Sequence, residues 1–178
     1  LDQDIYKIEY IEPIKLLCNS RFDLYSKLLF IDDIEKDSDN YQELYLSFIS
    51  AFTLGKYKEP GNKKKLGSSS FVKSFKKIYE SIKENGFDIE KSIIPISKEG
   101  VILNGSHRLA CSIKNNVKLV PCIRLKINSP KYDYKFFKFR NVPMDFLDQS
   151  VQKLLSLKKE IYAAIVWPSG VKNNINYE

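Results

Sequence analysis

The most informative part of the sequence is the stretch Val101-Ile102-Leu103-Asn104-Gly105-Ser106-His107-Arg108-Leu109-Ala110. Its first three residues are apolar and strand-forming, so they predict a short strand. Asn104-Gly105 is a turn pair, because glycine adopts positive φ without strain. Ser106 is a favourable N-cap for the helix that the following apolar spacing predicts. The stretch therefore predicts a strand, a tight turn and the first turn of a helix.

A helix that begins at this turn presents amide N–H groups without intrahelical partners and the positive end of its dipole. Both features favour an anion such as phosphate. Gly105 has no side chain to keep the anion from the backbone, and Arg108 can bind it through two parallel hydrogen bonds. The residue types therefore predict a phosphate site at the start of the helix.

His107 is the only histidine among the 178 residues. It stands beside Arg108 at the start of the predicted helix, where an imidazole can donate a hydrogen bond to a bound anion. The alternative is a histidine that packs under the turn and hydrogen-bonds to the backbone. The sequence leaves both interpretations open.

The segments on both sides of the turn extend it to a longer sequence pattern. Pro95-Ile96 precedes it, Gly100 to Leu103 leads into it, and Val120-Pro121 follows the helix. Together with Asn104 to Arg108, these segments resemble the ParB/sulfiredoxin-like superfamily, which has the core pattern PI…G-x-I-x-(D/N)-G-x-x-R followed by VP. The similarity covers about residues 69–125, with a weaker one at residues 5–27. It implies an α+β fold in which a small mixed β-sheet is flanked by helices.

The resemblance implies a nucleotide-dependent phosphotransferase, a kinase that acts on a hydroxyl group. ATP or another nucleoside di- or triphosphate would be bound through its phosphates by Asn104, Gly105, Ser106, His107 and Arg108. Arg108 and His107 would also act in catalysis, and Mg²⁺ would bridge phosphate oxygens without direct protein ligands that the sequence identifies. ParB-like free serine kinases carry Asp at the position of Asn104 and His at that of Ser106, so this chain departs from them twice.

Those serine kinases also have a catalytic carboxylate shortly after the first strand. Asp23 is the best-placed acid here for that role, and Glu12 is the other candidate. Arg21 and Lys27 lie on the same predicted helix as Asp23, where they would contact the substrate or its phosphate. Charges at this spacing are also typical of a solvated helix face.

A second resemblance extends over more of the chain. It rests on Arg21-Phe22-Asp23 with Lys27, on the stretch that ends in Asn85-Gly86-Phe87-Asp88, and on Ile102 to Arg108. These segments look like ParB-like proteins of bacterial surface-polysaccharide loci. The resemblance implies that the acceptor is a hydroxyl of a small molecule or of a sugar or glycan precursor.

The main alternative is a ParB-like module that binds nucleotide or nucleic acid without catalysis. The net charge of +7 favours an anionic partner. However, only about one helix and one strand follow Ile127, which leaves no room for a helix-turn-helix reader, so we expect nucleic-acid binding to be at most weak and non-specific. Sulfiredoxin chemistry is excluded because it needs a thiolate where this chain has Ser106.

We expect a single domain over residues 1–178, with an N-terminal strand at residues 5–11 and a core at about residues 69–125. A helix from Arg21 to Ile31 precedes an insertion at residues 32–68. The insertion begins with a loop from Asp32 to Asn40 and continues with an aromatic-rich helix from Tyr41 to Phe52. Its last part, Gly55 to Ser70, is a lysine-rich loop in which Lys63, Lys64 and Lys65 either close over a phosphate or form a basic surface loop.

The pattern after this loop predicts further helices and strands. A helix capped by Ser69 or Ser70 ends at Asn85-Gly86 with a left-handed cap, and strands follow at Ile93–Ile96 and Val117–Ile127. In the extension at residues 126–178, aromatic and basic residues alternate over 131–140. We favour a strand or extended arm there over a base-stacking surface. A helix at Asp145–Lys159 and a buried strand at Ile161–Trp167 complete the expected elements.

Composition limits the class of protein. No apolar run approaches the ~20 residues of a membrane-spanning helix. The three cysteines, Cys18, Cys111 and Cys122, lack metal-binding spacing and are typical of reduced thiols. We therefore expect a cytoplasmic protein without a membrane span or a structural zinc site.

Overall fold

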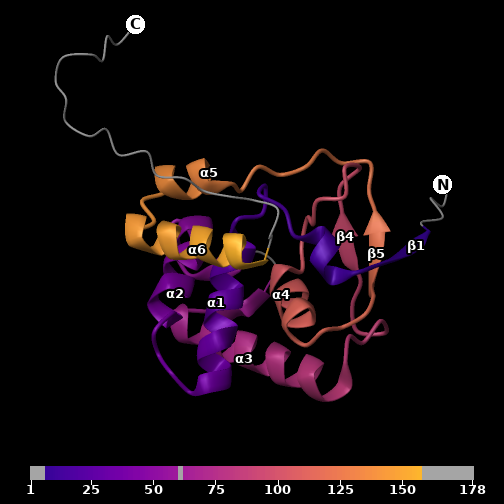
Figure 1. Cartoon of the computed structure of the whole chain (residues 1–178), viewed down its shortest axis with the longest axis horizontal. Coiled ribbons are helices and arrows are strands. Elements are labelled where there is room, and N and C mark those ends of the chain that lie inside the picture. Colours follow the sequence, from indigo (N-terminus) through magenta and orange to yellow (C-terminus); the bar gives the residue numbers. More distant parts are fainter. Residues whose placement is uncertain (1–6, 60–61, 158–178) are drawn as a thin grey trace, which may run out of the picture.

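The computed structural model describes residues 7–59 and 62–157, with the side chains of all of these except residues 59 and 62–65. A three-stranded mixed sheet forms one end of the described part (Figure 1). Its strands are β1 (Ile8–Ile11), β4 (Ile94–Ile96) and β5 (Val120–Arg124), in the order β1-β5-β4. The central strand β5 is antiparallel to β1 and parallel to β4. The expected α+β fold with a small mixed sheet is thus confirmed.

Helix α4 (Ser106–Lys114) connects the parallel strands β4 and β5, as a parallel pair requires. Between β4 and α4 the chain turns back, but Val101–Leu103 does not form the predicted strand. Its only ladder contact among the described residues is an isolated bridge between Ile96 and Ile102. Two hydrogen bonds hold it to β4, from Leu103 N to Pro95 O at 2.8 Å and from Ser97 N to Val101 O at 2.8 Å. Pro95 has no N–H to extend this ladder.

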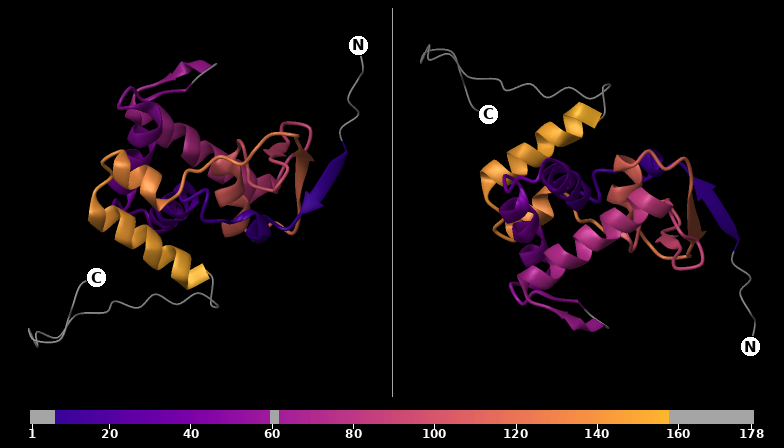
Figure 2. Two further views of the ribbon diagram at one scale, coloured as in Figure 1. Left: turned by 90° about the horizontal axis from the view of Figure 1, so that it is seen from above. Right: turned by 90° about the horizontal axis from the view of Figure 1, so that it is seen from below.

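The other helices surround α4 on the sides that do not face the sheet (Figures 1 and 2). They are α1 (Asp23–Lys36), α2 (Gln42–Thr53), α3 (Ser68–Asn85), α5 (Tyr134–Phe139) and α6 (Met144–Leu157), and a short 3₁₀ helix spans Pro13–Leu16. α1 is the central helix, because it contacts α2, α4 and α6. α3 packs against α4 on another side.

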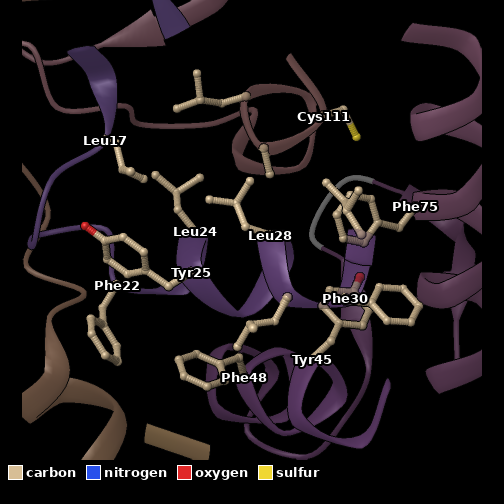
Figure 3. Packing of buried hydrophobic residues seen from close by; sticks show 14 of the residues in the cluster. Leu17, Phe22, Leu24, Tyr25, Leu28, Phe30, Tyr45, Phe48, Phe75 and Cys111 are labelled. Atoms are coloured by element: carbon tan, nitrogen blue, oxygen red, sulfur yellow. The ribbon is translucent and has the colours of Figure 1, made fainter. Parts of the chain in front are cut away.

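The core is rich in aromatic side chains (Figure 3). Leu24 and Leu28 of α1 are fully buried under α4, and Phe30 stacks on Tyr45 of α2 with ring centroids 4.7 Å apart. Phe75 of α3 packs against the same pair, 5.2 Å from the Tyr45 ring. Each such side chain contributes about 1.5–3 kcal/mol through burial. This aromatic cluster joins the helical insertion to the rest of the chain.

Helix α1 is longer than predicted. The residues that the sequence assigned to a loop from Asp32 onward continue the helix to Lys36, and Asp37 ends it with φ of +50°. The acidic residues Asp32 and Glu35 are stable in this part of the helix because both form ion pairs with Lys114 of α4. Asp33 instead accepts hydrogen bonds from Ser38, Asn40 and Tyr41, which fixes the turn into α2.

Two further predictions were wrong. The loop expected at 55–70 contains a hairpin of β2 (Lys58–Glu59) and β3 (Asn62–Leu66). The arm expected at 131–140 is largely helix α5, because Asp133 caps it by accepting a hydrogen bond from Phe136 N at 2.9 Å. The predicted strand at 161–167 lies outside the described residues.

Candidate functional site

The predicted phosphate turn lies at the start of α4, as the sequence indicated. Gly105, not Ser106, is the N-cap residue, with φ of +86° and ψ of +20°. Asn104 Oδ1 accepts a hydrogen bond from Gly105 N at 2.6 Å, which closes the turn. No N-cap side chain accepts from the first turn of α4. The amide groups of this turn therefore keep the anion-binding character expected of a helix start.

Arg108 folds back over this turn. A Cβ atom placed on Gly105 would lie 3.0 Å from Arg108 Nη2, closer than ordinary van der Waals contact. Gly105 thus suits the backbone conformation of the turn, and its lack of a side chain leaves room for the guanidinium group. The turn and the arginine form one unit.

The Arg108 guanidinium is partly buried, and burial lowers its pKa from the ordinary value. Within residues 7–59 and 62–157 it has neither a hydrogen bond nor an ion pair with another residue. Burial of a cation costs free energy unless an anion compensates it. The arrangement therefore favours an external anion as the partner of Arg108.

Arg108 also lines a cleft of about 680 Å³ between the second half of α3, the segment 86–93 and the start of α4. Lys77 of α3 and Lys91 add two positive charges to its wall. Ser74, Ser81 and Ser92 add hydroxyl groups. The polar part of the cleft thus matches the chemistry of a phosphorylated ligand.

The rest of the cleft differs in character. Ile78, Ile82, Phe87 and Ile93 form an apolar part of its wall. Asp88 is its one lining carboxylate, with Oδ2 2.9 Å from Lys91 Nζ, and the hydrogen bond from Lys91 lowers the pKa of Asp88. Sequence reasoning gave no role to Lys77, and it named Asp88 only within the second resemblance, because neither has a local spacing that marks a site.

His107 does not line this cleft. Its Nε2 lies 2.9 Å from the Tyr45 hydroxyl, and its ring meets Phe75 edge-on with centroids 4.6 Å apart. Tyr45 of α2 and Phe75 of α3 therefore hold the imidazole. The packing interpretation of His107 describes this position better than direct contact with a ligand in the cleft.

Arg21, Asp23 and Lys27 form a buried ion cluster. The exposed fractions of these three residues are 4%, 0% and 1%, so the solvated helix face considered from the sequence is wrong. Asp23 accepts from Arg21 Nε and Nη2 at 2.9 and 3.0 Å and from Lys27 Nζ at 2.8 Å. Burial opposes ionisation of Asp23, but Lys27 and Arg21 outweigh it and hold its pKa far below the ordinary value.

This environment makes Asp23 a poor proton acceptor, since a low pKa and two cationic partners both stabilise the ionised form. Asp23 also does not line the cleft. The other candidate base, Glu12, is exposed at the end of β1, and its Oε1 lies 2.6 Å from Lys15 Nζ. The geometry assigns Asp23 to the interior and brings neither acid to the cleft wall.

The three lysines of the predicted lid belong to β3, and their side chains lie outside the described ones. β3 leads into the first turn of α3, whereas the cleft lies along the second half of that helix. Figure 2 shows the hairpin projecting from the start of α3 and diverging from that helix. The lid formed by Lys63, Lys64 and Lys65 stays a prediction.

Among the described residues, no group of three or more His, Cys, Asp or Glu side chains is arranged to hold a metal ion. The same part of the chain has no helix that is long and apolar enough to cross a membrane. Comparisons with models of protein families, with curated proteins and with solved structures found no match.

Proposed function

We propose that this protein is a nucleotide-dependent phosphotransferase that binds the nucleotide phosphates in the cleft between α3 and the start of α4. The observation that supports it most is the Arg108 guanidinium, which lies over Gly105 without an acidic partner among the described residues. The turn from Asn104 to Arg108 resembles that of the ParB/sulfiredoxin-like superfamily, and this resemblance supports the same proposal.

The two parts of the cleft fit the two parts of a nucleotide. Phosphates would bind at Arg108, Lys77 and the first-turn amides of α4, and the base would pack on the apolar part near Phe87. The volume of about 680 Å³ is within the range of ligand sites, roughly 300–1,000 Å³. ATP is the donor we propose, with another nucleoside di- or triphosphate as the alternative.

Phosphoryl transfer depends on positioning and charge neutralisation more than on covalent chemistry by the protein. The acceptor hydroxyl oxygen forms the new P–O bond as the terminal P–O bond of the nucleotide breaks. Lys77, Lys91 and Arg108 neutralise the phosphate oxygens. Asp88 orients the hydroxyl and accepts its proton, since it has one exposed ion pair, with Lys91, whereas the buried Asp23 has two. Mg²⁺, when bound to the nucleotide, supplies further charge neutralisation, and Asp88 is the one cleft carboxylate that fits its oxygen-ligand preference.

The acceptor we propose is a hydroxyl of a small molecule or of a sugar or glycan precursor, on the resemblance to ParB-like proteins of surface-polysaccharide loci. A donor such as ATP places the reaction in the cytoplasm. A nucleotide-binding module without catalysis is the second candidate, and the burial of Asp23 in ion pairs is the observation that favours it.

Isothermal titration calorimetry with ATP, ADP, CTP and GTP in Mg²⁺ tests the binding step. Lys77→Ala and Lys76→Ala form a matched pair, since both lysines are exposed on α3 and only Lys77 lines the cleft. We expect Lys77→Ala to weaken binding by roughly 5- to 10-fold and Lys76→Ala by less than about twofold. Equal effects of the two variants would show that the nucleotide does not bind in this cleft.

Transfer of the terminal phosphate from the nucleotide to candidate acceptors, measured as the phosphorylated acceptor, tests the transfer step. Asp88→Asn should retain nucleotide binding but lower turnover by about 10²–10⁴-fold. Full turnover in that variant would remove Asp88 from the mechanism. Tight nucleotide binding with no transfer to any hydroxyl acceptor would favour the module without catalysis.

A further inference from the structure

The buried Arg21–Asp23–Lys27 cluster reaches the phosphate turn through the backbone. Arg21 Nη1 donates a hydrogen bond to Ile102 O at 2.7 Å, and Ile102 is two residues before Asn104. The same guanidinium is held by Asp23 through Nε and Nη2. One arginine thus links the start of α1 to the segment that leads into the turn.

The position of this bond follows from the short pairing with β4. Leu103 N and Val101 O bond to Pro95 O and Ser97 N, so the residues on either side of Ile102 face β4. In an antiparallel pair the carbonyl of the intervening residue points away from the partner strand. Ile102 is fully buried, so its carbonyl needs a donor from elsewhere in the core. Arg21 supplies it.

Asp23 and Lys27 fix the direction of that donor. Both Asp23 oxygens accept from the Arg21 fork, which leaves Nη1 aimed at Ile102, and Lys27 Nζ binds Asp23 Oδ2 from the next turn of α1. The Arg21 guanidinium also lies over the Tyr132 ring, 5.6 Å from its centroid. A bidentate pair of this kind holds a guanidinium in one orientation.

We propose that Arg21 is a positioning residue that sets the conformation of the Asn104–Arg108 turn and thereby its affinity for phosphate. The inference rests on the proposed phosphate site. It assigns Asp23, which the resemblance implied as the catalytic carboxylate, to the orientation of Arg21. The Arg21 fork and the Ile102 carbonyl are the parts of the structure that carry this inference.

The first test uses Arg21→Met and Arg124→Met, with pyrophosphate as the ligand in calorimetry. Arg124 is a matched control, because it also makes a bidentate ion pair, with Glu9, and donates to backbone carbonyls, those of Ser97 and Lys98. We expect Arg21→Met to weaken pyrophosphate binding about tenfold or more and Arg124→Met to change it less than twofold. Similar effects of both variants would overturn the positioning role.

A second variant separates positioning from stability. Replacing a buried ion cluster by apolar residues of similar size is often neutral or stabilising. The triple variant Arg21→Met/Asp23→Leu/Lys27→Met should therefore lose less stability than Arg21→Met, with the unpaired Ile102 carbonyl as the remaining loss, yet bind pyrophosphate as weakly as Arg21→Met. Normal binding in a stable triple variant would overturn the proposal.

The Gly105 amide gives a readout that needs no ligand. In ¹H–¹⁵N spectra, its hydrogen bond to Asn104 Oδ1 reports the turn conformation directly. We expect this resonance to shift in Arg21→Met and to stay in place in Arg124→Met. An unshifted Gly105 resonance in Arg21→Met contradicts the inference. A shifted resonance in a protein that binds neither nucleotide nor pyrophosphate would confirm positioning while refuting the proposed function.

Discussion

The hydroxyl of Tyr45 in α2 lies 2.9 Å from Nε2 of His107, one residue before the arginine of the phosphate turn. The Tyr45 ring is fully buried and stacks on Phe30 with an interplanar angle of 3°. The helical insertion thus supports the first turn of α4 through a rigid aromatic group. His107 is held by this contact and by Phe75, while Arg108 lines the cleft.

Tyr45→Phe tests this contact because it removes the hydroxyl and keeps the stacked ring. We expect the free energy of unfolding to fall by about 1 kcal/mol, the net value of a typical hydrogen bond. Nucleotide affinity should fall by less than about threefold, since 1.4 kcal/mol would be tenfold and His107 does not line the cleft. Chemical denaturation and calorimetry measure the two effects. A much larger loss of affinity than of stability would place His107 in contact with the ligand.

Arg108→Ala should separate binding from stability. Loss of a charge-assisted bidentate contact costs about 1.5–3 kcal/mol, so nucleotide affinity should fall by one to two orders of magnitude. The melting temperature without ligand should stay constant or rise, because the variant removes a partly buried cation that has no acidic partner among the described residues.

Calorimetry and thermal unfolding of Arg108→Ala and Arg108→Lys check this expectation. Arg108→Lys keeps the charge but loses the planar fork, so its affinity should lie between those of the other two proteins. Unchanged nucleotide binding in Arg108→Ala would exclude the start of α4 as the phosphate site. A large drop in the unliganded melting temperature would show that Arg108 has a structural partner.

Gly105→Ala combines a backbone penalty with a steric one. Positive φ costs a non-glycine residue about 1–2 kcal/mol, and the added Cβ would meet Arg108 Nη2 at 3.0 Å. Gly55→Ala is the control, because Gly55 also has positive φ but an added Cβ there has no atom within 4 Å. Both variants should lose stability in denaturation, and only Gly105→Ala should lose nucleotide affinity. Equal affinities would mean that Arg108 does not need the space at Gly105.

The pH dependence of stability should reveal the ion pairs around Asp32. Burial opposes ionisation of Asp32, but hydrogen bonds from Lys114 and Lys153 outweigh it and lower its pKa. A lowered pKa in the folded state means that this stabilisation is complete above the ordinary value of about 3.9 and is lost as the pH falls through the folded-state value. Asp32→Asn should therefore flatten the loss of unfolding free energy below about pH 4.

Denaturation of Asp32→Asn at several acidic pH values checks this expectation. Asp148→Asn is the matched control, because Asp148 is an exposed aspartate on α6. It should keep the pH dependence of the unmodified protein. An identical pH dependence in the Asp32 variant would show that the contacts to Lys114 and Lys153 do not stabilise the fold.

The sequence predicted the elements whose signals are local. Asn104-Gly105 marked the turn before α4, and the apolar spacing from Tyr41 to Phe52 marked α2. Helix α1 continues through the expected loop because Asp32 pairs with Lys114 and Lys153. These lysines are far away in the sequence, so no local pattern shows the pairing. The aromatic residues of 131–140 alternate like a strand, but the cap at Asp133 favours helix α5.

The candidate site was predictable only in part, for the same reason. Arg108 and Gly105 stand together in the sequence, so their partnership could be inferred from spacing. Lys77 and Asp88 reach the cleft because α3 packs on α4 and the segment after α3 turns back. The spacing of Arg21, Asp23 and Lys27 was noticed, but burial of a charged triplet depends on packing that one-dimensional periodicity does not encode.

Asp23→Asn gives the sharpest distinction between a base and a buried structural carboxylate. If Asp23 were a catalytic base, the Asp23→Asn variant would lose turnover by about 10²–10⁴-fold with little change in stability. A carboxylate that compensates two buried cations should instead cost about 3–5 kcal/mol of unfolding free energy when it is neutralised. We expect the second result, because Asp23 is fully buried between Arg21 and Lys27.

The measurement is chemical denaturation of Asp23→Asn beside Asp88→Asn, which neutralises a carboxylate of the cleft instead. The ion pair of Asp88 with Lys91 is at the surface, so its variant should lose far less stability than Asp23→Asn. Turnover should show the reverse order once both proteins are measured under conditions in which they are folded. A stable Asp23→Asn protein with abolished turnover would return the base to Asp23, and it would require that Arg21 and Lys27 release the carboxylate when substrate binds.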